Sequence, residues 1–176
     1  PEIIVYSADV GVVLDLASKN AWPDLVDYIV TKLEALKNAG ADFAAISANT
    51  PHIVFDDISA RSPLPLLSIV EETYKITKKM DIKKIGLIGT KFTMQSTFYS
   101  DVFSQGKIQV IVPDSEEQEY MHDKLMSEIE YGIFKDETRN ELLTIIKRMK
   151  DENQIEGLIL GCTEFPLILT QNAFDI

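Results

Sequence analysis

Short apolar runs alternate with longer amphipathic segments along this sequence, and the alternation constrains the fold more than any other feature. The runs 84–89 and 157–160 are short and, apart from Lys84, continuously apolar, which predicts strands buried within a parallel sheet. Segments 116–131 and 137–152 carry apolar residues at helical spacing, so we expect helices there. The order of these elements predicts an α/β fold with mostly parallel sheets.

The remaining elements follow the same plan. Further strands are expected at 3–6, 42–47, 66–68 and 108–112, and further helices at 23–40, 52–59 and 70–81. We place the domain boundary near residue 81. The first α/β domain then comprises 1–81 plus about 166–176, and the second comprises 82–165. Because the chain starts inside a predicted strand, we expect the first domain to lack its N-terminal strand and helix.

Composition narrows the class of partner. The 17 Lys and Arg residues against 28 Asp and Glu give a formal net charge of −11, which disfavours binding to nucleic acid. No apolar run approaches the roughly 20 residues needed to cross a bilayer, so we expect no membrane partner. The single cysteine excludes an internal disulfide and a multi-thiolate metal site. It also favours a reducing, cytoplasmic location.

Three polar turns follow predicted strands, at 48–52, 89–93 and 161–164. Ligands of α/β proteins bind beyond the carboxyl ends of the strands, where Thr hydroxyls and helix-start amides can hold a carboxylate. The same residue types are also ordinary helix N-caps. A single such turn favours a cap, whereas three turns at equivalent positions favour a binding site.

Cys162 is the residue that carries the most chemical information. A thiol between a buried strand and a helix start is expected to have a pKa below the free-cysteine value of about 8.5, so it loses its proton more readily. The alternative is an inert, buried cysteine, which the flanking Gly161 and Thr163 disfavour. His52 and Glu164 are possible site residues, although local packing and the helix dipole explain them equally well. We expect His122, on a charged helix, to be exposed to solvent.

The segments 47–52, 86–94 and 157–164 resemble the cofactor-independent aspartate/glutamate racemase family, in its aspartate racemase and broad-specificity amino-acid racemase branch. The resemblance implies two similar Rossmann-like domains with the ligand cleft between them, and a homodimer. It further implies catalysis without a cofactor or a metal ion. One thiol removes the α-proton of an amino acid, and a second thiol on the opposite face returns a proton, as inversion at one carbon requires.

Mapped onto this sequence, the second thiol is Cys162, whereas the position of the first base holds Ala48. An alanine has no proton to exchange. Three explanations of Ala48 remain open. The alanine is an engineered replacement of a cysteine, or the protein has lost racemase activity, or another group serves as the first base, such as Ser47, Thr50, His52 or water. Expected contacts to the substrate carboxylate and amino group are Asn49, Thr50, Thr90, Thr93 and Thr163. Segment 7–14 holds no arginine of the kind that aspartate-selective relatives use, so the amino acid stays open.

The sequence therefore predicts a racemase-like isomerase acting on aspartate, glutamate or a broader range of amino acids, with Cys162 as the acid/base. Because of Ala48, we expect impaired or single-base activity. One alternative uses Cys162 as the nucleophile of an isomerase or decarboxylase in the same superfamily. A second alternative is a non-catalytic module that binds carboxylates.

Overall fold

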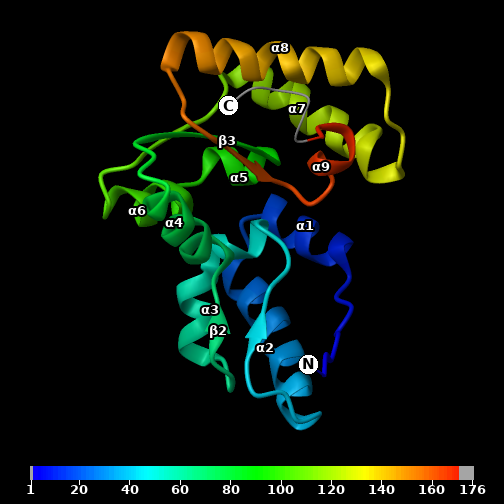
Figure 1. Cartoon of the computed structure of the whole chain (residues 1–176). Coiled ribbons are helices and arrows are strands. Elements are labelled where there is room, and N and C mark those ends of the chain that lie inside the picture. Colours follow the sequence, from blue (N-terminus) through cyan, green and yellow to red (C-terminus); the bar gives the residue numbers. More distant parts are fainter. Residues whose placement is uncertain (1, 171–176) are drawn as a thin grey trace. The chain divides into compact units, whose positions relative to one another are not determined.

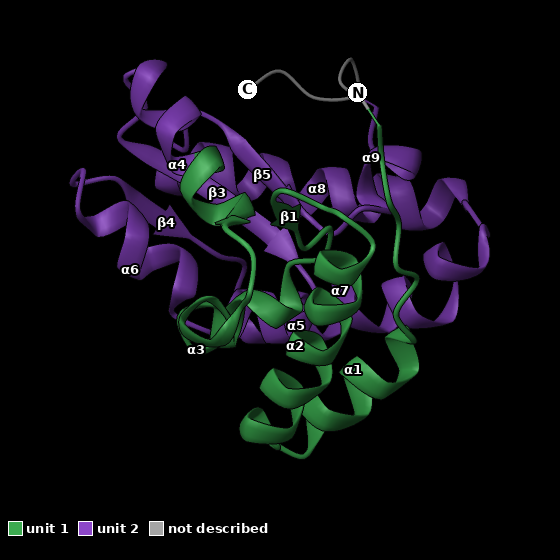
Figure 2. Cartoon of the chain, turned by 90° about the horizontal axis from the view of Figure 1, so that it is seen from below, with its two compact units in different colours: residues 1–73 green, residues 74–176 purple. Residues whose placement is uncertain are grey.

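A computed structural model of the chain describes residues 2–170 (Figure 1). The chain forms two compact units, residues 1–73 and 74–176, which Figure 2 shows in different colours. Strands and helices alternate in both units, and every strand pairing within residues 2–170 is parallel, which confirms the predicted α/β class. The chain passes from the first unit to the second between Thr73 and Tyr74, inside helix α4 (Ile69–Lys79). The predicted boundary near residue 81 stays a prediction.

The first unit packs its helices around one apolar core. Its elements are α1 (Val10–Ser18), α2 (Trp22–Asn38), β1 (Ala44–Ala45), η1 (Thr50–Val54), α3 (Phe55–Arg61), β2 (Leu66–Leu67) and the start of α4. Strands β1 and β2 pair in parallel, with Ala44 opposite Leu66. Leu25 of α2 and Ile58 of α3 are fully buried in this core. The predicted helix after Pro23 is confirmed, because apolar residues at helical spacing face the core.

The predicted strand at 3–6 is wrong. Residues 2–9 are not in regular secondary structure, and the side chains of Ile3 and Val5 are 79% and 80% exposed. A strand is stabilised by hydrogen bonds to a neighbouring strand, and none of the strands in residues 2–170 pairs with this segment. Helix α1 follows instead. Its N-cap Asp9 accepts a hydrogen bond from the Gly11 N–H at 2.8 Å.

The second unit is built on a three-stranded parallel sheet in the order β4-β3-β5. The strands are β3 (Lys84–Gly89), β4 (Gln109–Ile111) and β5 (Leu158–Gly161). The helices are α5 (Lys91–Gln95), α6 (Phe98–Ser104), α7 (Ser115–Ser127), η2 (Ile129–Tyr131), α8 (Asp136–Asn153) and α9 (Phe165–Ile168). Helix α7 contacts both β3 and α8. Leu125 and Leu142, from these two helices, are fully buried in the core.

The central strand β3 and its neighbour β5 end at the same level. Gly89, the last residue of β3, lies opposite Gly161, the last residue of β5. A Cβ atom on Gly161 would lie 2.8 Å from the Ile88 carbonyl oxygen, and one on Gly89 would lie 3.1 Å from the Gly161 carbonyl oxygen. The two strand ends approach this closely because neither carries a side chain. The turns that follow them therefore start side by side.

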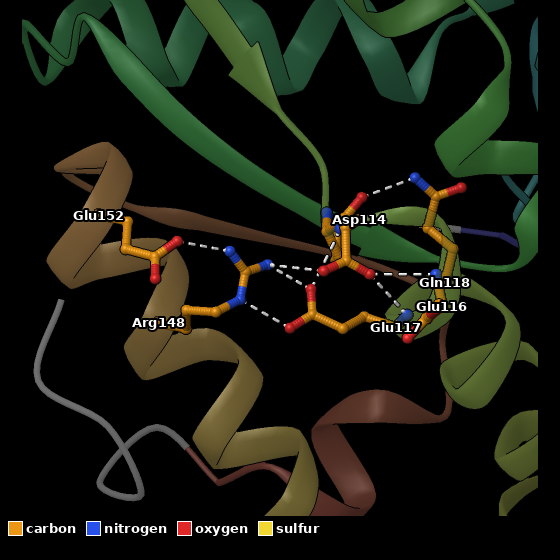
Figure 3. Close-up of polar contacts among 7 residues, drawn as sticks. Asp114, Glu116, Glu117, Gln118, Arg148 and Glu152 are labelled. Carbon is orange, nitrogen blue, oxygen red and sulfur yellow. Dashed lines mark hydrogen bonds and ion pairs between the residues drawn. The ribbon is translucent and has the colours of Figure 1, made fainter.

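An ion-pair network joins α8 to the start of α7 (Figure 3). The Nε atom of Arg148 donates to Glu117 Oε1 at 2.7 Å, and its Nη2 pairs with Glu117 Oε2. Glu117 also completes a capping box with Asp114, whose side chain accepts from the N–H groups of Glu116 and Glu117. The Nη1 atom of Arg148 pairs with Glu152 at 2.8 Å. One guanidinium thus fixes α8 against the first turn of α7.

The end of the described chain belongs to the second unit. Ile168 and Leu169 are buried in its core. The assignment of residues from about 166 to the first domain stays a prediction. Residues 171–176 of that predicted tail lie outside the described residues. None of the helices within residues 2–170 is long and apolar enough to cross a membrane. The same residues contain no cluster of three or more His, Cys, Asp or Glu side chains suited to a metal ion.

Candidate active site

The turn after β3 is built around two threonines. Thr90 is the N-cap of α5, and its side chain accepts a hydrogen bond from the Thr93 N–H at 3.3 Å. The two hydroxyl oxygens are 3.2 Å apart, and the methyl group of Thr93 packs against the strand ends at Gly89 and Gly161. Thr90 is 7% exposed and Thr93 is fully buried. Thr90 and Thr93, both predicted to contact the substrate, therefore lie in one turn, and the Thr93 side chain also packs against the backbone of the two strand ends.

In the turn after β5, two consecutive polar side chains donate hydrogen bonds to the carboxylate of the residue that follows them. The Cys162 thiol donates to Glu164 Oε2 at 2.9 Å, and the Thr163 hydroxyl donates to Glu164 Oε1 at 2.9 Å. Thr163 is exposed, whereas Cys162 and Glu164 are half-buried. The hydrophobic side of Cys162 packs against the core of the second unit. Cys162 therefore has an apolar side and a hydrogen-bonded thiol.

These surroundings reverse the predicted behaviour of the thiol. Burial, followed by the hydrogen bond to the Glu164 carboxylate, raises the pKa of Cys162 to about 12. The expectation that the start of a helix would lower this pKa is therefore wrong. Removing the proton would leave a thiolate in a partly apolar site beside a carboxylate, which is electrostatically unfavourable. At neutral pH the group is a thiol that holds its proton.

The turn after β1 lies in the first unit. Ala48 is exposed, whereas Asn49 and Thr50 are 9% and 7% exposed. The turn leads into η1, and the N–H of His52 donates to the Asn49 carbonyl at 2.8 Å. Position 48, where the resemblance places the first base, thus has access to solvent, while the next two residues are fixed by the fold.

His52 is buried and both of its ring nitrogens contact the backbone. Nδ1 lies 2.9 Å from the Ala48 carbonyl oxygen, and Nε2 accepts from the Ile69 N–H at 3.2 Å. Burial is the main cause that lowers the pKa of His52, so the ring is neutral at neutral pH. Both ring nitrogens are hydrogen-bonded to backbone groups of the first unit. This supports a structural role in local packing for His52, one of the two roles that the sequence left open.

His122 is a residue that the sequence interpretation misjudged. The prediction of a solvent-exposed side chain is wrong, because the ring is half-buried and lies edge-on to Phe92 at 6.0 Å. Its Nδ1 atom is 3.5 Å from the Lys91 N–H, next to Thr90. Helical spacing from the buried Gln118 and Leu125 on α7, four residues before and three residues after His122, was the signal that could have indicated this position.

Lys135 lies at a helix boundary. It is the N-cap residue of α8 and pairs with Glu128 Oε1 at 2.9 Å. Glu128 also accepts from Lys124 at 2.8 Å and from Thr138 at 2.6 Å. These three hydrogen bonds, of which the one from Lys124 has the largest effect, lower the pKa of Glu128 to about 2. Lys135 therefore helps to neutralise a buried carboxylate.

Within the second unit, the structure brings five of the predicted site residues to one sheet edge. They follow the paired strand ends at Gly89 and Gly161, and they are Thr90, Thr93, Cys162, Thr163 and Glu164. The edge combines a protonated thiol, a carboxylate and hydroxyl groups. Such a set can transfer a proton and hold a carboxylate through hydrogen bonds.

Parallel strands with chemically active turns at their carboxyl ends, and a thiol in one of those turns, define a class of α/β proteins that bind small ligands at sheet edges. The sequence matches the family described as Asp/Glu/Hydantoin racemase over residues 1–175, and the chain belongs to this family.

Individual relatives agree with this assignment. The chain is 26% identical over 169 residues to the broad specificity amino-acid racemase RacX of Bacillus subtilis, covering 96% of this chain and 71% of the relative. It is 29% identical over 136 residues to glutamate racemase 3 of Caldanaerobacter subterraneus, covering 76% of this chain and 47% of the relative. An aspartate racemase homologue from Pyrococcus horikoshii superposes with a TM-score of 0.85 at 32% identity, covering 100% of this chain and 76% of that chain.

Proposed function

We propose that this protein is a cofactor-independent amino-acid racemase-like isomerase in which Cys162 exchanges the α-proton of its substrate. Family membership supports the racemase class. The contact that carries the assignment of Cys162 is the 2.9 Å hydrogen bond from its thiol to Glu164 Oε2. The substrate is aspartate, glutamate or a broader range of amino acids. A cytoplasmic homodimer that binds a small molecule is part of the same proposal.

In the proposed reaction, Cys162 and Glu164 hold every proton that is transferred to or from the α-carbon. Glu164 Oε2 takes the proton of the thiol, which leaves a thiolate and a neutral carboxylic acid. The thiolate then removes the α-hydrogen as a proton, and the electron pair of the C–H bond delocalises into the substrate carboxylate. Return of a proton from sulfur to carbon and from Glu164 to sulfur restores the starting state. Exchange of the thiol proton with water between these steps labels the α-carbon.

Donors around the substrate carboxylate would stabilise the charge that develops during this step. We assign this role to Asn49, Thr50, Thr90 and Thr163, with Thr93 holding the Thr90 hydroxyl. The hydrogen bond between the two threonine hydroxyls supports this division of roles. Removal of one such donor costs about 10²-fold or more in other enzymes. Removal of any one assigned donor should therefore lower the rate of α-proton exchange measurably.

The absence of a side-chain base at Ala48 defines the expected stereochemistry. With Cys162 as the single base, α-proton exchange is expected from one enantiomer, with much slower conversion to the other. Incubation of D- and L-aspartate and of D- and L-glutamate in deuterated water, followed by mass spectrometry and chiral chromatography, measures both rates.

Two matched variants test the role of the thiol. Cys162→Ser is expected to abolish the exchange, because a serine hydroxyl is a far weaker acid. Thr163→Val keeps the thiol but removes both the other hydrogen bond to Glu164 and a proposed carboxylate donor, so it is expected to slow the exchange about 10²-fold without abolishing it. If Cys162→Ser exchanges as fast as the parent, Cys162 is not the base.

A second candidate function is carboxylate binding without turnover, and Ala48 is the observation that favours it. This function predicts that an amino acid or dicarboxylate raises the melting temperature while no α-deuterium enters the ligand. The third candidate uses Cys162 as a nucleophile and needs the same thiolate as the proposed base. Because burial and the Glu164 carboxylate raise the pKa of the thiol to about 12, either role requires that Glu164 first takes the proton. A covalent adduct with an unsaturated diacid, detected by mass spectrometry, would favour this candidate.

A further inference from the structure

The hydrogen bonds of His52 define which of its ring nitrogens carries hydrogen. Nε2 accepts from the Ile69 N–H at 3.2 Å, and because a backbone N–H can only donate, Nε2 is the unprotonated nitrogen. Nδ1 therefore carries the hydrogen and donates it to the Ala48 carbonyl oxygen at 2.9 Å. The ring is 3% exposed and stacks on Phe55, with ring centroids 4.9 Å apart and planes 1° apart. Burial and stacking hold the ring in this orientation.

Each of these bonds satisfies a backbone group that lies outside regular secondary structure or at the end of a helix. Ile69 is the first residue of α4, and its N–H has no partner within the helix. The Ala48 carbonyl lies in the turn between β1 and η1. In addition, the backbone N–H of His52 donates to the Asn49 carbonyl at 2.8 Å. One residue thus connects two consecutive peptide groups of the turn to the start of α4.

We propose that His52 is a positioning residue that holds the Ala48–Asn49–Thr50 turn through its Nδ1–H tautomer, and that it does not contact the substrate itself. The part of this inference that concerns the turn stands on geometry alone. The part that concerns catalysis rests on the proposed function, in which Asn49 and Thr50 hold the substrate carboxylate.

Two substitutions separate the bonds of the ring. His52→Asn keeps a donor near the place of Nδ1 and loses the acceptor for Ile69, whereas His52→Gln keeps an acceptor near the place of Nε2 and loses the donor to Ala48. If the bond to Ala48 positions the turn, the amide protons of Asn49 and Thr50 exchange with solvent at near-parental rates in His52→Asn. In His52→Gln they exchange at least tenfold faster. The Ile69 amide proton shows the opposite order.

These measurements need no activity. Nitrogen-15 spectra of the imidazole ring in the parent protein read the tautomer directly, and a His122→Asn variant assigns the signals to His52. The expected spectrum has hydrogen on Nδ1 and none on Nε2. Hydrogen on Nε2, or equal acceleration of the Asn49 and Thr50 amides in both variants, overturns the proposal.

The link to catalysis is tested with α-deuterium exchange of aspartate and glutamate. His52→Gln is expected to raise the KM at least tenfold, while His52→Asn stays within about threefold of the parent at equal folded fraction, measured by urea unfolding. Equal KM values for the two variants, with the amide pattern intact, overturn the link to substrate binding. Absence of exchange in the parent instead refutes the proposed function and leaves the positioning of the turn decided by the spectra.

Discussion

The thiol of Cys162 donates its hydrogen to the carboxylate of Glu164, two residues further along the chain, at 2.9 Å. The thiol keeps its proton in this hydrogen bond, and the short turn after β5 holds the two groups together. Because Glu164 also accepts from Thr163, both carboxylate oxygens have defined partners. A proton that leaves sulfur therefore has a fixed destination, which makes this pair the centre of the proposed chemistry.

Replacing Glu164 by glutamine is expected to lower the pKa of Cys162 below its value of about 12. Burial, the largest cause of the elevation, remains in the variant, so the pKa stays above the ordinary value. The rate of alkylation by iodoacetamide as a function of pH measures this change, and the single cysteine makes the label unambiguous. Glu130→Gln is the control, because Glu130 contributes only a weaker charge interaction. An identical pH profile for Glu164→Gln and the parent would contradict the contact.

Introducing a thiol at the position of the missing base is expected to raise racemisation. Ala48→Cys would provide a second acid/base, so the interconversion of the enantiomers should increase by at least tenfold over the parent. Chiral chromatography of aspartate and glutamate measures the rate. Ala45→Cys, which adds a thiol at another exposed alanine, is expected to give no increase. If Ala48→Cys also gives none, Ala48 does not occupy the position of the first base.

The free energy of unfolding is expected to fall as the pH is lowered below about 6.5. Burial lowers the pKa of His52, so the unfolded chain binds this proton more tightly than the folded chain does. The contribution is fully present above the ordinary histidine pKa of about 6.5 and is lost towards the lowered folded value. One such group gives a slope of at most about 1.4 kcal/mol per pH unit. Urea unfolding at pH 7.5, 6.5 and 5.5 measures the slope, which should be shallower in His52→Gln.

Arg148→Ala, which removes the guanidinium, is expected to lower the free energy of unfolding by about 1–2 kcal/mol. The reason is that Glu117, whose side chain is 17% exposed, loses a bidentate partner. The adjacent Lys147, whose side chain is 74% exposed, forms an ion pair with Asp151. Lys147→Ala is therefore expected to change stability by less than about 0.5 kcal/mol. Chemical unfolding of both variants measures the difference, and equal effects would show that the network has no special stabilising role.

Much of the second unit could be predicted from the sequence, because local patterns determine it. Continuous apolar runs predicted β3 and β5, and helical spacing predicted α7 and α8. The sequence also predicted that Thr and Cys residues lie in the turns after these strands, and the structure places them there. Their role as site residues stays a prediction. The strand predicted at 3–6 failed because a strand depends on a partner, which an isolated apolar run does not reveal.

The electrostatics of the site required the structure. The sequence places Glu164 two residues after Cys162, but only the backbone of the turn decides that the carboxylate accepts from the thiol. The direction of the pKa shift depends on this contact and on burial, so it was predicted with the wrong sign. The contact of the His122 ring with Phe92 could not be predicted for the same reason. The ring lies against Phe92 because α7 packs on α5, and this packing is a tertiary contact.

The paired glycines at the ends of β3 and β5 limit how this protein can be altered. The Ile88 carbonyl lies where a side chain on Gly161 would start, so even alanine there forces the backbones of two strands apart. That movement would separate the thiol from the threonines across the sheet edge. Redesign towards another ligand therefore has to leave both strand ends untouched and to change the turn side chains beyond them.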